Sequence, residues 1–134
     1  MPFTPAQLFV LVGDIERYPV FLPWCLGARI RERQGNVITA DLIIGYKAFR
    51  EKFTSIVTLA EPERISVRYG GGPLSHLSNE WHFKPGADNG CEVGFFVDFS
   101  FRSSMLSTMM DMFFDKAFRK MMAAFEKRAH ELYD

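Results

Sequence analysis

Between residues 28 and 101, apolar and polar side chains alternate with a period of two, which is typical of strands with one buried face. Short turns rich in glycine, proline and asparagine interrupt the pattern. Strands joined by such short connections pair antiparallel, because parallel neighbours need a long crossover. We therefore expect an antiparallel meander of about six strands, at Ala28–Arg33, Val37–Ile44, Phe49–Leu59, Ile65–Tyr69, Leu77–Phe83 and Glu92–Phe101.

The last third of the chain changes to a helical period. Apolar residues recur at steps of three and four from Leu106 to Leu132, and charged residues take the other side. Ser103 or Ser104 can cap the start, which predicts one amphipathic helix of about 28 residues. Because a sheet with one apolar face must bury that face, we expect this helix to cover it. The predicted fold class is α+β, with a curved sheet gripping the helix and a cavity where the two separate.

The first residues predict a short helix. Thr4 is a suitable N-cap and Pro5 suits the first helical position, so the helix should run to about Val12 and end at Gly13. A second short turn begins near Ile15. We expect it to stop before Tyr18, because a residue that precedes proline is biased away from helical geometry.

The segment "YPVFLPWC", from Tyr18 to Cys25, concentrates rigid and apolar side chains. Its two prolines fix φ and remove two backbone donors, so Phe21, Leu22 and Trp24 take fixed directions at a low entropy cost. Two interpretations remain open. The segment is either a plug that closes one end of the core or the mouth of a cavity, and one set of side chains could serve both.

Strand alternation places two polar residues on apolar faces. Asn79 shares a face with Leu77 and Trp81, and Glu51 shares a face with Phe53. Each needs a hydrogen-bond partner, a compensating charge or a position near an opening. Structural satisfaction by neighbouring groups is one interpretation, and a polar anchor for a ligand oxygen is the other. The methionines and phenylalanines of the terminal helix are similarly open to interpretation as core or as cavity wall.

Several function classes are disfavoured. Sixteen basic and sixteen acidic residues give a net charge of zero, which argues against nucleic-acid binding through bulk charge. A local basic patch stays open, formed by Arg29, Arg31, Arg33, Arg50 and Lys52. The three histidines and two cysteines lack metal-ligand spacing, and no histidine lies near Cys25 in sequence to activate it. No apolar run is long enough to span a bilayer, and we expect a cytoplasmic protein.

Four parts of the sequence resemble one known family: "FVLVGDIERYPVFLPWC", "REKFTS", "GPLSHLSNEWHF" and the terminal helix rich in Phe and Met. They resemble the coenzyme Q-binding protein family of the START-like superfamily, which also bears the label polyketide cyclase/dehydrase and lipid transport. Some bacterial members are ribosome-association toxins of toxin–antitoxin pairs. The resemblance covers nearly the whole chain, so we treat residues 1–134 as one START-like domain.

The resemblance implies a helix-grip fold whose apolar cavity binds a polyprenyl quinone such as ubiquinone, without catalysis. It implies a lipid carrier or chaperone that supports respiration and visits a membrane surface peripherally. Alternatives are a ribosome-associating toxin or a polyketide cyclase-like enzyme, for which Glu51, Asp98 and Asp41 are the only acidic candidates and Asp98 is expected to face solvent. We expect no metal and no catalytic cofactor. The expected cavity and mouth residues are Tyr18, Phe21, Leu22, Pro23, Trp24, Glu51, Phe53, Leu77, Asn79, Trp81, Met109, Met110, Phe113, Phe114, Phe118 and Met121.

The family pattern also includes a strand before the part that matches Pro2, and this chain lacks it. That strand would pair with the final strand, Glu92–Phe101. We therefore expect an open, apolar sheet edge there, which favours a homodimer formed edge to edge. Alternatively, Met1–Phe3 folds back and covers part of the edge, or the native protein starts earlier and this chain is a fragment of it.

Overall fold

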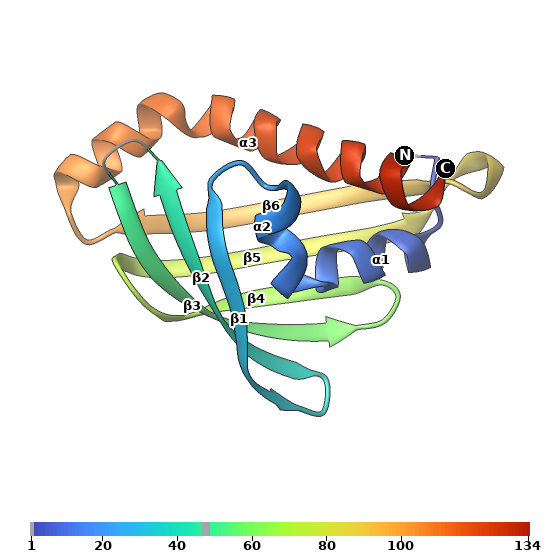
Figure 1. Ribbon diagram of the computed structural model, residues 1–134, viewed down its shortest axis with the longest axis horizontal. Helices are drawn as coiled ribbons and strands as arrows, with labels where there is room; N and C mark the ends of the chain where they lie inside the picture. Colours follow the sequence, from blue (N-terminus) through green and yellow to red (C-terminus); the bar gives the residue numbers. More distant parts are fainter. Residues whose placement is uncertain (1, 47–48) are drawn as a thin grey trace.

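The structure is a computed structural model that describes residues 2–46 and 49–134, without the side chains at 46, 49, 106, 107 and 109–113. Six strands follow one another across a single curved sheet, each antiparallel to the next (Figure 1). The predicted meander is therefore confirmed, with strands that extend further than the alternation indicated. They are β1 (Cys25–Gln34), β2 (Val37–Tyr46), β3 (Phe49–Ala60), β4 (Arg64–Gly71), β5 (Leu74–Pro85) and β6 (Cys91–Phe101).

The long C-terminal helix α3 (Ser104–Tyr133) lies across the inner face of the sheet (Figure 1). This confirms the α+β class and the predicted helix, which has 30 residues. In its C-terminal half, Phe125 and Ala129 are buried. The helix and the sheet form two layers, and the core lies between them.

Helix α1 (Pro5–Gly13) begins and ends where the sequence predicted. The Thr4 hydroxyl accepts a hydrogen bond from the Gln7 backbone nitrogen at 3.2 Å, and the Gln7 side chain accepts one from the Thr4 nitrogen at 2.9 Å. This capping box satisfies two backbone donors at the helix start. The helix packs against β5 and α3 and buries Leu8, Phe9, Leu11 and Val12.

The prediction that Tyr18 would not be helical was wrong. A 3₁₀ turn, η1 (Ile15–Arg17), leads directly into α2 (Tyr18–Phe21), and Tyr18 has φ −52° and ψ −41°. Pro19 lies in the first turn of this helix, where its missing N–H has no intrahelical partner to lose. The Tyr18 hydroxyl also donates to the Val12 carbonyl, which holds the residue in place.

One aromatic residue joins three elements of the core. The Phe125 ring of α3 meets the rings of Tyr18 and Phe21 from α2 at centroid distances of 5.7 and 5.3 Å. It also meets Trp81 of β5 at 5.3 Å. These edge-on contacts fix the distance between helix and sheet at this end of the molecule.

Strand β6 lies at an edge of the sheet, as expected. Its Phe96 side chain is 55% exposed on the outer face. Phe3 is buried against α3, where its ring lies 5.0 Å from His130 and 6.0 Å from Tyr133. Met1 is outside the described residues, so cover of this edge by Met1–Phe3 and dimerisation through it stay predictions.

No helix in the described part of the chain combines the length and apolar character that crossing a membrane requires.

We predict that Phe125→Ala lowers the free energy of unfolding by about 3–5 kcal/mol, because it removes a ring at the junction of α2, α3 and β5. Urea denaturation followed by circular dichroism measures this change. Phe96→Ala is the matched control, since Phe96 is exposed, and it should change stability by less than about 0.5 kcal/mol. Equal losses in the two variants would contradict this role for Phe125.

Candidate functional site

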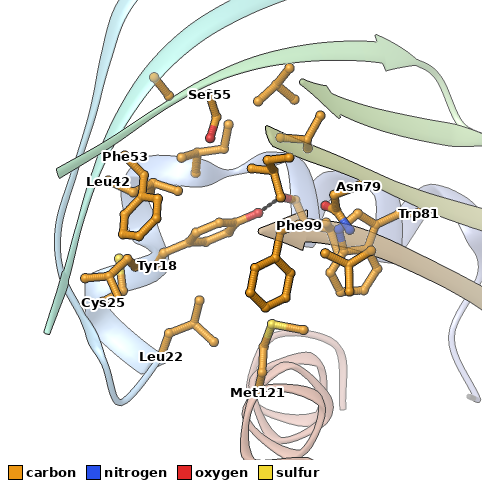
Figure 2. A pocket seen from close by; sticks show the side chains of 18 of the residues that line it. Tyr18, Leu22, Cys25, Leu42, Phe53, Ser55, Asn79, Trp81, Phe99 and Met121 are labelled. Carbon is orange, nitrogen blue, oxygen red and sulfur yellow. Dashed lines mark hydrogen bonds between the residues drawn. The ribbon is translucent and has the colours of Figure 1, made fainter. Parts of the chain in front are cut away.

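A cavity of about 330 Å³ lies between the inner face of the sheet and the helices (Figure 2). All six strands contribute to its wall, together with Val12 of α1, Ile15 of η1, Tyr18 of α2, and Met121 and Phe125 of α3. The sheet curves away from α3 here, so the side chains of the two layers do not meet. The wall is almost entirely apolar.

Strand alternation explains which side chains enter the cavity. On β5, Leu77, Asn79 and Trp81 face inward, which confirms that these three share one face. The same alternation runs through the neighbouring strands. It brings Phe95, Val97 and Phe99 of β6, and Phe53 and Ser55 of β3, to the cavity wall.

About half of the expected site residues line this cavity. The structure brings together residues from the proline-rich segment, β3, β5 and the middle of α3. Figure 2 shows most of them around a common space. They are Tyr18, Leu22, Trp24, Phe53, Leu77, Asn79, Trp81 and Met121.

Five expected residues lie outside the cavity wall. Phe21 packs behind Tyr18, with ring centroids 6.0 Å apart, and the Pro23 and Glu51 side chains are exposed. Phe114 and Phe118 form a second layer on α3, because their rings pack behind those of Phe99 and Phe95 at 5.4 and 5.1 Å. A helical stripe is wider than the part that faces one cavity, so the apolar pattern over-predicted the wall.

The side chains of Met109, Met110 and Phe113 lie outside the described residues, and the prediction that they line the cavity stays untested.

The sequence analysis missed several wall residues, among them Val12, Ile15, Cys25, Ser55 and Phe125. Parity on β3 could have identified Ser55, since it lies between Phe53 and Val57 on the same face. Whether the other missed residues line the cavity depends on how their elements pack in the fold. In particular, Cys25 begins β1 rather than ending the proline-rich segment, and its thiol enters the wall.

Two polar groups of the wall are engaged with the backbone. The Tyr18 hydroxyl donates to the Val12 carbonyl (Figure 2). Asn79 Nδ2 donates to the Phe96 carbonyl at 2.8 Å, so a neighbouring backbone group satisfies one of its two N–H groups. Since a carboxamide has two N–H groups and an oxygen, Asn79 retains further hydrogen-bonding capacity.

The wall residues that the structure describes include no Asp, Glu, His, Lys or Arg. Glu51 lies on the inner side of β3 but beyond the wall, where it is exposed. Asp98 has a side-chain exposure of 64% on the outer face, which confirms that it faces solvent. Asp41 also lies outward and accepts a hydrogen bond from Thr54 at 2.7 Å. None of these three carboxylates lines the cavity.

Two titratable groups of the wall are neutral at pH 7. Burial raises the pKa of the Tyr18 hydroxyl far above its ordinary value of 10.0 and that of the Cys25 thiol above 9.0. A neutral, apolar wall can hold an apolar molecule and offer it a few hydrogen bonds. It lacks the paired acid and base that most hydrolytic or cyclising chemistry uses.

Burial of the inner face of β3 decreases toward one end of the cavity, which we call the rim. Along the inner face of β3, Glu51 is exposed, Phe53 is half-buried and Ser55 is only 4% exposed. The Trp24 carbonyl accepts a hydrogen bond from the Gly45 nitrogen at 2.9 Å, so Trp24 lies at the Glu51 end of the sheet. Trp24 both lines the cavity and is half-exposed, whereas Leu22 is buried. The proline-rich segment thus contributes to the inner wall and to the rim.

The outer face of the sheet carries several exposed basic side chains. Arg29 and Arg31 on β1, Lys52 on β3, and Arg68 on β4 are exposed there. Arg31 forms an ion pair with Asp41 at 3.5 Å. A break in register between Ile30 and Glu32 places Arg33 opposite the inward-facing Ile38. The expected grouping of Arg33 with Arg29 and Arg31 was therefore wrong, because a bulge reverses the alternation.

Residues 1–126 match the family model for polyketide cyclase / dehydrase and lipid transport proteins. The ribosome association toxin RatA of Rickettsia prowazekii (strain Madrid E) is 37% identical over 136 residues, which cover 98% of this chain and 92% of the relative. The mitochondrial coenzyme Q-binding protein COQ10 homolog B of Xenopus laevis is 30% identical over 135 residues. That match covers 98% of this chain and 55% of the relative, so this chain spans about half of its length.

A START superfamily protein from Mycobacterium smegmatis superposes with a TM-score of 0.85 at 17% sequence identity. The superposition covers 98% of this chain and 93% of the other. At this identity the likeness shows the fold alone, and it confirms the START-like helix-grip architecture.

We predict that stability falls as the pH rises above about 9, because the folded state binds the protons of Cys25 and Tyr18 more tightly than the unfolded chain. The contribution of each group is complete below its unfolded pKa and is lost as pH rises towards its folded value. Urea denaturation between about pH 8 and pH 11 measures the decline. The free energy of unfolding of Tyr18→Phe should decline less steeply with pH. A slope identical to that of the unmodified protein would contradict a buried, protonated Tyr18.

Proposed function

Because the chain belongs to the polyketide cyclase / dehydrase and lipid transport family, we propose that it binds a polyprenyl quinone such as ubiquinone and carries it without chemical change. The observation that supports this most directly is the neutral, apolar cavity between sheet and helix. A relative from Xenopus laevis that is named a coenzyme Q-binding protein supports the same ligand class.

The size of the cavity limits how much of a ligand it can enclose. Its volume of about 330 Å³ is near the lower end of ligand pockets, which span roughly 300–1,000 Å³. A substituted ring and the first part of a tail fit such a space, and the rest of a long tail must leave through the rim. Each buried apolar Å² of the ligand contributes roughly 25 cal/mol.

Two exposed apolar residues flank the rim segment in sequence. Val20 of α2 is 62% exposed and precedes Pro23 and Trp24, and Leu26 of β1 is 49% exposed and follows them. Such a surface suits brief contact with a membrane from which a tail is drawn. We accordingly propose a cytoplasmic carrier that supports respiration and visits the membrane peripherally.

A cyclase-like enzyme is less well supported. The family description includes cyclases, and such chemistry needs titratable groups that converge on the substrate. Among the described wall residues the titratable side chains are those of Tyr18 and Cys25, and burial raises the pKa of each. Binding therefore accounts for the site better than catalysis.

We predict that a short-chain ubiquinone quenches the fluorescence of Trp24 and Trp81, which both line the cavity. Val67→Phe should weaken this binding at least about tenfold, because the larger ring projects from β4 into the space of the ligand. Fluorescence titration with the quinone gives both dissociation constants.

The matched control is Val10→Phe, since Val10 is 57% exposed on α1 and does not line the cavity. It should bind the quinone like the unmodified protein. Absence of quenching in the unmodified, folded protein would contradict quinone binding. Equal binding by Val67→Phe and the control would place the ligand elsewhere.

A second candidate function uses the outer face. The exposed Arg29, Lys52 and Arg68 give this face an excess of positive charge beside Glu32 and Asp41. Such a face can bind a polyanion such as ribosomal RNA. The relative named as a ribosome association toxin supports this alternative. Because cavity and outer face lie on opposite sides of the sheet, the two functions can be tested separately.

For this candidate, the double variant Arg29→Glu and Arg68→Glu should bind ribosomes at least about tenfold more weakly. Added salt should likewise weaken ribosome binding by the unmodified protein. Cosedimentation with purified ribosomes measures the binding. Val67→Phe is the control, because it alters the cavity and leaves the outer charges unchanged. Equal cosedimentation of the double variant and the control would contradict ribosome binding through this face.

A further inference from the structure

We propose that Ser55 is the hydrogen-bonding anchor of the cavity and that it holds a ligand oxygen in the buried part of the cavity, so that the ligand enters ring first and leaves its tail at the rim. The inference rests on the proposed function and specifies which part of the ligand is recognised. The ligand class that it defines is a prenylated ring that bears a carbonyl or hydroxyl oxygen.

Ser55 is a polar residue in a place where polar residues are rare. It is 4% exposed, and among the described residues it is the only polar or charged one that is buried. Its hydroxyl points into the cavity in Figure 2. No protein group among the described residues forms a hydrogen bond with that side chain, and its oxygen is accessible from the cavity. A hydroxyl that faces an apolar cavity without a protein partner is free to bond to an incoming oxygen atom.

The other polar groups of the wall are less available. Tyr18 uses its single hydrogen on the Val12 carbonyl, so its oxygen can only accept. Asn79 uses one N–H on the Phe96 carbonyl. Ser55 can donate to a carbonyl oxygen or accept from a hydroxyl, because its hydroxyl rotates freely between these roles. The indole N–H groups of the wall can only donate, and Asn79, which keeps one N–H and its oxygen, is less buried than Ser55. Ser55 is therefore the enclosed group of the wall that can bind both a quinone and the corresponding quinol.

The position of Ser55 sets the direction of the ligand. Its neighbours across the strands are the fully buried Ala40 on β2 and the half-buried Tyr69 on β4, and the residue two steps toward the rim is the half-buried Phe53. Glu51, two further steps along β3, is exposed at the end where Trp24 lies. A ring whose oxygen reaches Ser55 thus lies inside, and its substituent points along β3 toward the rim.

The test compares two probes that differ in their oxygens: a benzoquinone that carries a ten-carbon chain, and benzene with the same chain. Quinone binding is read from tryptophan quenching, and binding of the alkylbenzene from its displacement of the quinone. Ser55→Ala should weaken quinone binding about three- to tenfold and leave alkylbenzene binding unchanged, because it removes one hydrogen bond and little volume.

Ser78→Ala is the matched control, since Ser78 is exposed on the outer face of β5. It should bind both probes like the unmodified protein. Undiminished quinone binding by Ser55→Ala, or an equal loss for both probes, would overturn the role of Ser55 while quinone binding itself stands. An unmodified protein that binds neither probe would overturn the proposed function and this inference together.

A third probe tests the direction of entry. A quinone with a bulky fluorophore at the far end of its chain should bind as tightly as the plain quinone, because that end lies outside the rim. If the fluorophore abolishes binding, the tail lies inside and the ring-first arrangement is wrong.

Discussion

The contact of Phe125 with the rings of Tyr18, Phe21 and Trp81 is the interaction on which the rest of the structure depends. It ties the terminal helix to both α2 and the sheet at one end of the molecule. From there the sheet curves away, and one helix cannot fill the space above six strands. The cavity is therefore a consequence of how a single helix covers a curved sheet, and its wall consists of residues that would otherwise form an ordinary core.

A single rule, the alternation of side chains along strands, separates two chemistries in this protein. Inward residues form a neutral wall around the cavity, and outward residues carry most of the charge. A β-bulge after Ile30 interrupts the alternation on β1 and turns Arg33 away from Arg29 and Arg31. Ligand binding and contact with a polyanion can thus coexist on one sheet without sharing side chains.

The polar groups inside the cavity differ in how much hydrogen-bonding capacity they retain. Tyr18 and Asn79 already bond to backbone carbonyls and help to hold α1 and β6 in place. Ser55 forms no such hydrogen bond with a described residue, and it lies where the inward residues of β3 become buried. A binding site of this kind gains affinity from apolar area and selectivity from a small number of unsatisfied groups.

The sequence alone determined the element order, the antiparallel meander, the long helix and the inward faces of β5 and β3, because alternation and helical period are local properties of the chain. It also identified Tyr18, Leu22, Trp24, Phe53, Leu77, Asn79, Trp81 and Met121 as wall residues. Only the tertiary structure placed Phe114 and Phe118 in a second layer, Glu51 outside the wall and Ser55 in its buried part. Those placements depend on the curvature of the sheet and its distance from α3, which arise from contacts between residues far apart in the sequence.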